Sequence, residues 1–352
     1  MPVTRSSSAL RSTSTANAIA STPQPAPPTE PKRKPSQAVA ASVSKKPKQT
    51  HAIGPETLRF PPLPSVPCKA KQSAFKLEDA NAHLIAVDPR FAKLFDQLVC
   101  KPFQPDQFET NPNPFESLCK SILGQQVSWL AARSITHKFI RLFFPELPEK
   151  ADAIITTPKP FPSPAQVSAC SIDRLRSAGA SQRKAEYLLD LSARFVDGRL
   201  SSEKLLEMNP DQIMEELCAV RGIGRWTVEM FLIFTIKHPD ILPCSDLGIQ
   251  KGLLRWYTST LPPPSPKKKQ TPKTPEPEGE VKVLWTQLPA PNLPSGSSLT
   301  MATMKARLVK PIKVGLYLTP KEMEELTEPW KPFRSIAVWY LWSLTDSLAA
   351  PL

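Results

Sequence analysis

The chain lacks any long apolar stretch and any paired cysteines. Its densest apolar run, Met230 to Ile236, has seven residues, far fewer than the roughly 18 that span a membrane. The N-terminus has no apolar core of the kind found in a secretory signal. The six cysteines lie far apart without a Cys-x-x-Cys motif, which excludes zinc-ribbon and iron–sulfur spacing. We therefore expect no membrane span, no secretion, no catalytic metal and no cofactor, with buried or idle thiols in a reducing compartment. Whether a cation binds at the hairpin described below stays open.

Proline and positive charge are concentrated in two segments. Residues 1–75 and 259–320 hold 13 and 12 of the 42 prolines. Residues 1–75 have 11 Lys and Arg against 2 Asp and Glu, residues 265–315 have 9 against 3, and the remainder has 25 against 27. The net charge of +13 thus belongs to these segments, and it indicates a polyanionic partner without locating a site.

Residues 1–75 are predicted to form a disordered basic tail, because their Ser, Thr, Ala, Pro and Lys cannot bury enough apolar surface to fold. The clusters at residues 32–34 and 45–48 are typical of a nuclear import signal, which predicts a nuclear location and an import receptor as partner. A solvated charged tail is the plain alternative. The first 29 residues contain no acidic side chain, as in mitochondrial presequences, so a mitochondrial location is the other alternative.

The remaining sequence has helical spacing and no alternating strand pattern. Leu77–Leu98 and Ser128–Phe144 are predicted helices, and Asn113 followed by a proline predicts the start of a further one. Residues 76–257 are therefore expected to form an all-α core. Residues 258–315, rich in Pro and Lys, are expected to be a long low-complexity insertion.

The C-terminal part returns to helical spacing. Thr319 is a candidate cap, followed by a first-turn proline and an acidic residue. Residues 316–352 are therefore predicted to complete the core.

A short turn with two glycines joins two predicted helices in a hairpin of residues 217–230. Glycine permits left-handed backbone and removes the Cβ that would keep a phosphate away from the amides. The N–H groups of Gly222, Gly224 and the following helix can then point at a DNA phosphate, while Ile223 packs into the core. A plain helical hairpin is the alternative; the two helices and Arg225-Trp226-Thr227 favour DNA binding, of a kind that positions a duplex without reading its sequence.

Asp246 stands where the next helix, Leu247–Tyr257, should begin. An aspartate there is ordinarily an N-cap. It lies 22 residues after Gly224, the length of one helix and a return loop, which brings it back toward the hairpin. This spacing favours a functional carboxylate beside bound DNA.

The order of hairpin, helix, proline-containing loop and aspartate resembles the helix-hairpin-helix (HhH-GPD) DNA glycosylases, and most of all the alkylbase enzymes of the DNA-3-methyladenine glycosylase II family. Further matches lie in Ile122–Ser128, with Gly-Gln-Gln, in Leu175–Ala185, and in Trp330–Ser335 with Tyr340–Trp342. The resemblance implies a two-lobed helical fold.

The resemblance also implies an activity. A monomeric enzyme of this family flips an alkylated purine, of the 3-methyladenine or 7-methylguanine type, out of duplex DNA and excises it. Asp246 would stabilise the oxocarbenium-like sugar and position or deprotonate water. Trp226, Met230 and Trp342 would line the pocket. The two tryptophans would favour a cationic base, with core packing as the alternative for both. Since bifunctional relatives have a lysine at the position of Trp226, we expect base removal only, which leaves an abasic site.

The resemblance assigns a set of DNA contacts as well. Gln126 would fill the gap left by the flipped nucleotide, with a solvent-facing glutamine as the alternative. The full set comprises Gln126, Ser128, Lys184, Gly222, Ile223, Gly224, Arg225 and Thr227. Competing interpretations are a non-catalytic DNA-binding module, for which Asp246 is dispensable, and an oxidised-base glycosylase, which the missing lysine disfavours. A basic scaffold protein would leave the ordered motifs unexplained.

Overall fold

The computed structural model describes residues 60, 61, 63, 75–109, 112–150, 160–259 and 290–343. The chain divides into two units, residues 1–51 and 52–352, and all described residues belong to the second. The predicted import clusters at 32–34 and 45–48 and the lysines at 267–269 lie outside the described residues.

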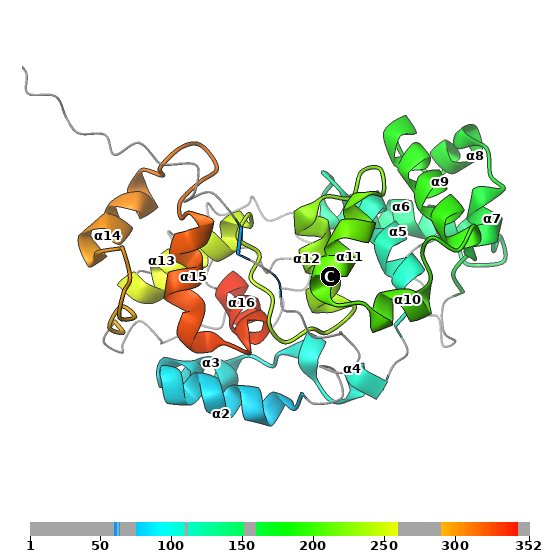
Figure 1. Ribbon diagram of the computed structural model, residues 1–352. Coiled ribbons are helices and arrows are strands. Elements are labelled where there is room, and N and C mark those ends of the chain that lie inside the picture. The colour runs from blue at the N-terminus through cyan, green and yellow to red at the C-terminus, as the bar shows by residue number, and fades with distance from the viewer. Residues whose placement is uncertain are drawn as a thin grey trace, which may run out of the picture. The chain divides into compact units, whose positions relative to one another are not determined.

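Within the described residues the fold is helical, as the all-α prediction requires, and the only β pairing there is an isolated bridge between Lys313 and Leu316. No helix in this part of the chain combines the length and apolarity needed to cross a membrane. The helices form two groups (Figure 1). The first consists of α5 (Pro114–Gly124), α6 (Trp129–Arg141), α7 (Pro164–Ser168), α8 (Ile172–Ser177), α9 (Gln182–Val196), α10 (Ser202–Glu207), α11 (Pro210–Cys218) and α12 (Arg225–Phe234).

The second group combines the two ends of this unit. It consists of α2 (Leu77–Val87), α3 (Arg90–Gln97), α13 (Leu247–Thr258), α14 (Met301–Val309), α15 (Pro320–Thr327) and α16 (Arg334–Ser343), with the 3₁₀ turn η4 (Glu328–Trp330). The turn η2 (Lys101–Phe103) and the short α4 (Asp106–Glu109) lead from α3 to the first group. Segments from both ends of the unit are therefore needed to build this group.

One apolar core runs through both groups. Leu217 and Leu232 from the first group and Leu253 and Leu341 from the second are fully buried members of the same cluster. Helix α13 packs against α14, α15 and α16. Its Gly252 allows the close approach of α16, since a Cβ there would lie 2.9 Å from the carbonyl oxygen of Leu341.

The predicted helix Leu77–Leu98 is two helices, and the prediction of one continuous helix is wrong. Pro89 cannot continue the hydrogen-bond ladder of α2, and the residue before a proline avoids helical backbone. Asp88 accordingly has φ −148° and ψ 108°. Its carboxylate accepts the backbone N–H of Arg90 and restarts the chain as α3.

The predicted caps at Asn113 and Thr319 are confirmed. The side chain of Asn113 accepts the N–H of Glu116 at the start of α5. Thr319 forms a capping box with Glu322 at the start of α15. In both helices proline occupies the first turn, where its missing N–H costs nothing.

The core extends beyond the limits predicted from composition. Phe75, assigned to the tail, is buried against Phe103 and Phe333, with ring centroids 5.9 and 5.8 Å away. The second part of the predicted insertion forms α14, whose Met304 is fully buried. The helical spacing of Met301–Val309 is not evident from composition, because the average composition of residues 258–315 is that of a low-complexity linker.

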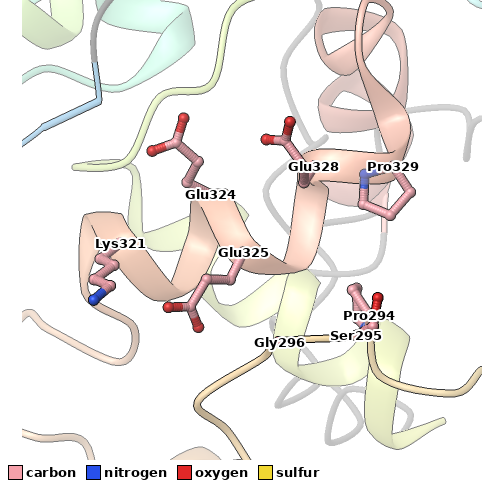
Figure 2. A pocket seen from close by; sticks show the side chains of 8 residues that line it. All are labelled: Pro294, Ser295, Gly296, Lys321, Glu324, Glu325, Glu328 and Pro329. Carbon is pink, nitrogen blue, oxygen red and sulfur yellow. The ribbon is translucent and has the colours of Figure 1, made fainter.

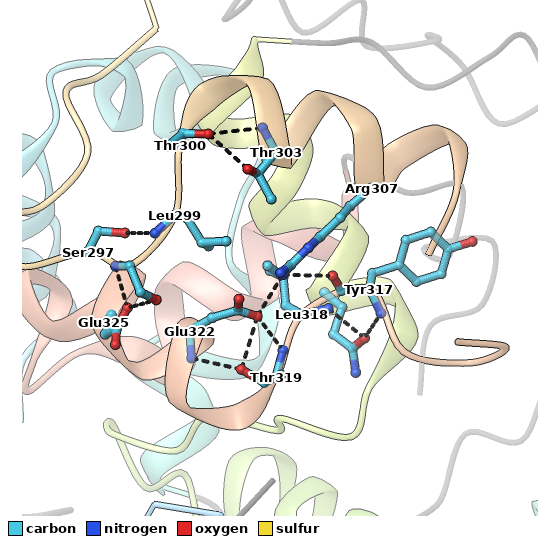
Figure 3. Close-up of polar contacts among 12 residues, drawn as sticks. Ser297, Leu299, Thr300, Thr303, Arg307, Tyr317, Leu318, Thr319, Glu322 and Glu325 are labelled. Carbon is cyan, nitrogen blue, oxygen red and sulfur yellow. Dashed lines mark hydrogen bonds and ion pairs between the residues drawn. The ribbon is translucent and has the colours of Figure 1, made fainter. Parts of the chain in front are cut away.

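Polar contacts fasten α14 to its neighbours (Figure 3). Arg307 on α14 pairs with Glu322 on α15 at 2.7 Å. The amide oxygen of Gln250 on α13 accepts the backbone N–H of Tyr317 at 2.8 Å. The chain between α14 and α15 is thereby held onto α13.

The return loop between α12 and α13 is anchored to α16. The Ser335 N–H donates to the Pro239 carbonyl, and the Ile241 N–H donates to the Ser335 hydroxyl, both at 2.9 Å. Arg334 forms an ion pair with Asp240, and their side chains are only 5% and 12% exposed. These contacts fix the loop that ends at Asp246.

We expect Asp240→Asn to lower the free energy of unfolding by about 3–5 kcal/mol, because the guanidinium of Arg334 would stay buried without a countercharge. Asp173→Asn is the control: its pair with Arg176 is exposed, and its loss should cost less than about 1 kcal/mol. Urea unfolding followed by circular dichroism measures both. Equal effects in the two variants would contradict this role for the buried pair.

Candidate active site

The hairpin turn runs from Ala219 to Gly224, between α11 and α12. Gly222 has φ +81°, and a Cβ there would lie 2.0 Å from the ring of Tyr187, so only glycine fits. Gly224 has φ −113°, and a Cβ there would meet no other atom within 4 Å. The left-handed backbone that the sequence predicts for the hairpin lies at Gly222. Gly224 does not have this conformation, and its missing Cβ leaves open space before the first turn of α12.

Neighbouring helices brace the turn from two sides. The Gly222 carbonyl accepts from the side-chain amide of Gln125 at 2.8 Å. The Arg221 N–H donates to the carboxylate of Asp190 on α9 at 2.8 Å. Ile223 is only 5% exposed, which confirms that it packs into the core. The turn is thus held rigidly by α9 and by the segment between α5 and α6.

The first turn of α12 presents free backbone donors. Its N-cap is Gly224, and no side chain caps it, whereas Asn209 caps α11 and Asp246 caps α13. The first N–H groups of a helix have no carbonyl partner within it, and the helix dipole makes this end positive. The side chain of Thr227 is buried, so this residue can offer only its backbone. Such an end can bind a phosphate.

Asp246 receives three N–H donors. Its Oδ1 accepts the backbone N–H of Ile249 at 2.9 Å, which makes it the N-cap of α13. The same oxygen accepts the indole N–H of Trp342 at 3.2 Å, and Oδ2 accepts the indole N–H of Trp226 at 2.8 Å. The N-cap of α13 and the carboxylate predicted to be functional are thus the same residue, and both tryptophans orient it. The three donors come from α12, α13 and α16, so these helices are joined through this one side chain.

The three predicted pocket residues differ in exposure. Trp226 is 46% exposed and can present part of its ring to a ligand. Trp342 is 8% exposed and stacks on Phe234 with centroids 5.6 Å apart, so the predicted core-packing role applies to it together with the bond to Asp246. Met230 is buried one turn after Trp226 on α12.

The segment between α5 and α6 lies against the hairpin. Gln126 is exposed and has φ +56°, an uncommon backbone conformation for glutamine that is typical of functional turns. Its neighbour Gln125 makes the bond to Gly222, a contact that the sequence did not predict. Ser128 is exposed and caps α6 through the N–H of Ala131. DNA contacts by Gln126 and Ser128 stay predictions.

Lys184 has a structural partner. Its ammonium donates to the Leu123 carbonyl near the end of α5 at 2.7 Å, and burial lowers the pKa of this lysine. The expected contact with DNA competes with this bond, which stabilises the turn preceding Gln126.

A buried acid lies behind the site and was not anticipated from the sequence. Glu229 on α12 is completely buried, and its Oε1 accepts from Nε of Arg225 at 2.8 Å. Arg225 also lies over the ring of Phe60, 4.5 Å from the centroid. Burial raises the pKa of Glu229 to about 7, the charge of Arg225 lowers it and that of Asp246 raises it. The signal in the sequence is an acid within the mostly apolar run from Val228 to Phe234.

A surface cavity of about 440 Å³ lies elsewhere, between residues 294–296 and α15 (Figure 2). Its charged lining consists of Lys321, Glu324, Glu325 and Glu328. The excess of negative charge disfavours a phosphate ligand. None of its lining residues belongs to the predicted site.

The chain is similar to known DNA repair proteins. Residues 119–274 match the family model described as "HhH-GPD superfamily base excision DNA repair protein". DNA-3-methyladenine glycosylase 1 of Schizosaccharomyces pombe is 28% identical over 177 residues, which cover 50% of this chain and 71% of that protein. DNA-3-methyladenine glycosylase of Saccharomyces cerevisiae is 26% identical over 281 residues, 77% and 81% of the two chains. The alkylbase DNA glycosidase-like protein mag2 of S. pombe is 24% identical over 278 residues, 78% and 96% of the two chains.

The two glycines of the hairpin give a matched pair of variants. Gly222→Ala should lower the free energy of unfolding by about 1–3 kcal/mol or more, because of its positive φ and the contact with Tyr187. Gly224→Ala should leave stability within about 0.5 kcal/mol and weaken DNA binding, because its methyl group enters the space in front of α12. Urea unfolding and fluorescence anisotropy with a labelled duplex measure these effects. Equal stability losses, or full DNA affinity of Gly224→Ala, would refute this division of roles.

Proposed function

We propose that the chain is a member of the HhH-GPD superfamily of base excision DNA repair proteins, whose model matches residues 119–274, and that it is a DNA glycosylase that excises alkylated purines from duplex DNA. The observation that carries the proposal is the carboxylate of Asp246, held between the indoles of Trp226 and Trp342. A plain N-cap needs neither indole. We propose further that the enzyme is specific for alkylated bases and acts by hydrolysis, as a type II glycosylase.

The chemistry begins with access to the base. A base inside a duplex is unreachable, so the nucleotide must leave the stack. The amides at Gly222, Gly224 and the start of α12 fix the backbone through a phosphate. Gln126, exposed beside this turn, fills the gap in the duplex. Asp246 follows directly on the anchored return loop, so it lies near the hairpin that holds the DNA.

Asp246 then acts on the sugar. Loss of the base turns the sugar into an oxocarbenium-like cation, which a fixed carboxylate stabilises. The same carboxylate positions or deprotonates the attacking water. Because both oxygens already accept indole N–H groups, their direction is set before the substrate arrives.

Selectivity for alkylated purines comes from charge. An alkylated purine is cationic and a good leaving group, and the exposed ring of Trp226 attracts it by about 0.5–2 kcal/mol through a cation–π interaction. An oxidised purine lacks this charge, so that substrate class is disfavoured.

We propose that the enzyme acts as a monomer.

We also propose that it is imported into the nucleus through the clusters at 32–34 and 45–48, with mitochondrial import as the alternative. Nuclear import is tested with a fluorescent fusion in which the lysines and arginine of both clusters are replaced by alanine. Loss of nuclear accumulation supports it, and unchanged nuclear signal contradicts it.

We expect base removal without strand cleavage. Trp226 has no amine to attack the sugar carbon, Arg225 and Arg221 are ion-paired and form no imine, and Lys184 is bound to a carbonyl. Product strands should break only after alkali, and borohydride should trap no protein–DNA adduct. Breaks without alkali together with a trapped adduct would refute hydrolysis as the mechanism.

The direct test is Asp246→Asn. Asparagine is also a good N-cap, so the fold should persist while the charge is lost. Release of methylated bases from alkylated duplex DNA should fall by about 10²–10³-fold, the size found for one electrostatic group at a reacting centre. Asp173→Asn, an exposed aspartate on α8, is the control and should be fully active. No base release by the wild type would favour the non-catalytic DNA-binding module. Full activity of Asp246→Asn would show that another residue stabilises the sugar cation.

A further inference from the structure

Glu229 has an unusual bonding state for a buried acid. One carboxylate oxygen accepts from Arg225. The other, Oε2, is buried and accepts no hydrogen bond from the described residues. A buried charged oxygen without a partner is costly, whereas a proton on it removes the charge. The side chain is therefore poised to exchange a proton.

The charges that face Glu229 come from three neighbouring elements as well as its own helix. They are Arg225 on α12, Asp246 at the start of α13, Cys244 on the return loop and Cys218 at the end of α11. Burial raises the pKa of Cys244 to about 12 and that of Cys218 above its usual value, so both thiols are neutral near pH 7. Among the described residues, the balance is thus between one cation, Arg225, and one competing carboxylate, Asp246.

Arg225 is also the first residue of α12, at the end proposed to bind a DNA phosphate. A phosphate there would compete with Glu229 for the guanidinium. It would also bring another negative charge close to the buried carboxylate, and both effects favour the protonated form of Glu229. Phe60 packs on the guanidinium and limits where it can move.

We propose that Glu229 is a positioning residue that holds Arg225 in the free protein and releases it to a DNA phosphate by taking up one proton. The proton comes from solvent and binds the carboxylate of Glu229. The ion pair between Glu229 and Arg225 breaks, and an ion pair between Arg225 and the phosphate forms in its place. The proposal rests on DNA binding at the hairpin, as in the proposed function, and goes beyond it by linking that binding to a proton.

The direction of the pH effect follows from linkage. The pKa of Glu229 is about 7 in the free protein and rises when DNA is bound, so the complex holds more protons between the two values. DNA affinity is therefore full at and below about pH 7 and falls as pH rises above it. The steepest possible loss for one proton is tenfold per pH unit.

The test compares the wild type with Glu229→Gln, which mimics the protonated acid permanently. The dissociation constant of a duplex carrying a stable abasic-site analogue is measured from pH 6 to 9 at constant ionic strength. We expect a several-fold weakening for the wild type between pH 7 and 8.5, and no such weakening for Glu229→Gln. At pH 8.5 the variant should bind more tightly than the wild type. Glu215→Gln, an exposed glutamate on α11, is the control and should behave as the wild type.

A purely structural role for Glu229 predicts the opposite, namely weaker binding by Glu229→Gln at every pH. The same pH dependence in wild type and Glu229→Gln would overturn the proposal while leaving the proposed function intact. No binding by the wild type at any pH would overturn both. Should Glu229→Gln fail to fold, calorimetry of the wild type at pH 7.5 in two buffers of different ionisation enthalpy replaces it. Net proton uptake supports the proposal, and no uptake overturns it.

Discussion

The meeting of two indole N–H groups on the carboxylate of Asp246 is the interaction on which the site depends. Trp226 comes from the hairpin helix α12 and Trp342 from the last described helix, α16, while the backbone N–H of Ile249 completes the set. A charge-assisted hydrogen bond is stronger and more directional than a neutral one. The carboxylate therefore keeps a single orientation as long as the helices that supply these donors keep their relative positions.

Further contacts hold these helices in their relative positions. The buried pair of Arg334 and Asp240 ties the return loop to α16, so Asp246 and Trp342 are fixed by the same helix. Gly222, against Tyr187 and Gln125, fixes the hairpin from which α12 and Trp226 emerge. The uncapped start of α12 thus lies on the same short helix as one of the donors to Asp246, which would couple the proposed phosphate site to the carboxylate.

The sequence predicted the parts that follow from local chemistry. The caps at Asn113 and Thr319, the turn at Gly222 and the helix start at Asp246 each depend on a few adjacent residues. The long-range parts could not be predicted in this way. The break at Pro89 was missed because helical spacing persists across it, and α14 because its segment was judged by average composition. The partners of Lys184 and Glu229 come from distant elements or from burial, which no local pattern reveals.

The orientation of Asp246 depends on both indoles, and a double-mutant cycle of Trp226→Phe and Trp342→Phe tests this dependence most directly. Phenylalanine keeps an aromatic ring but lacks the N–H donor and the second ring of the indole. Trp339→Phe is the control for the smaller ring, since no bond from Trp339 to Asp246 exists among the described contacts. In single-turnover base release, each variant should be slower by about 10–100-fold, the value of one hydrogen bond to a charged group. The double variant should lose less than the product of the two, because both bonds serve one carboxylate. Wild-type rates in both single variants would contradict the account.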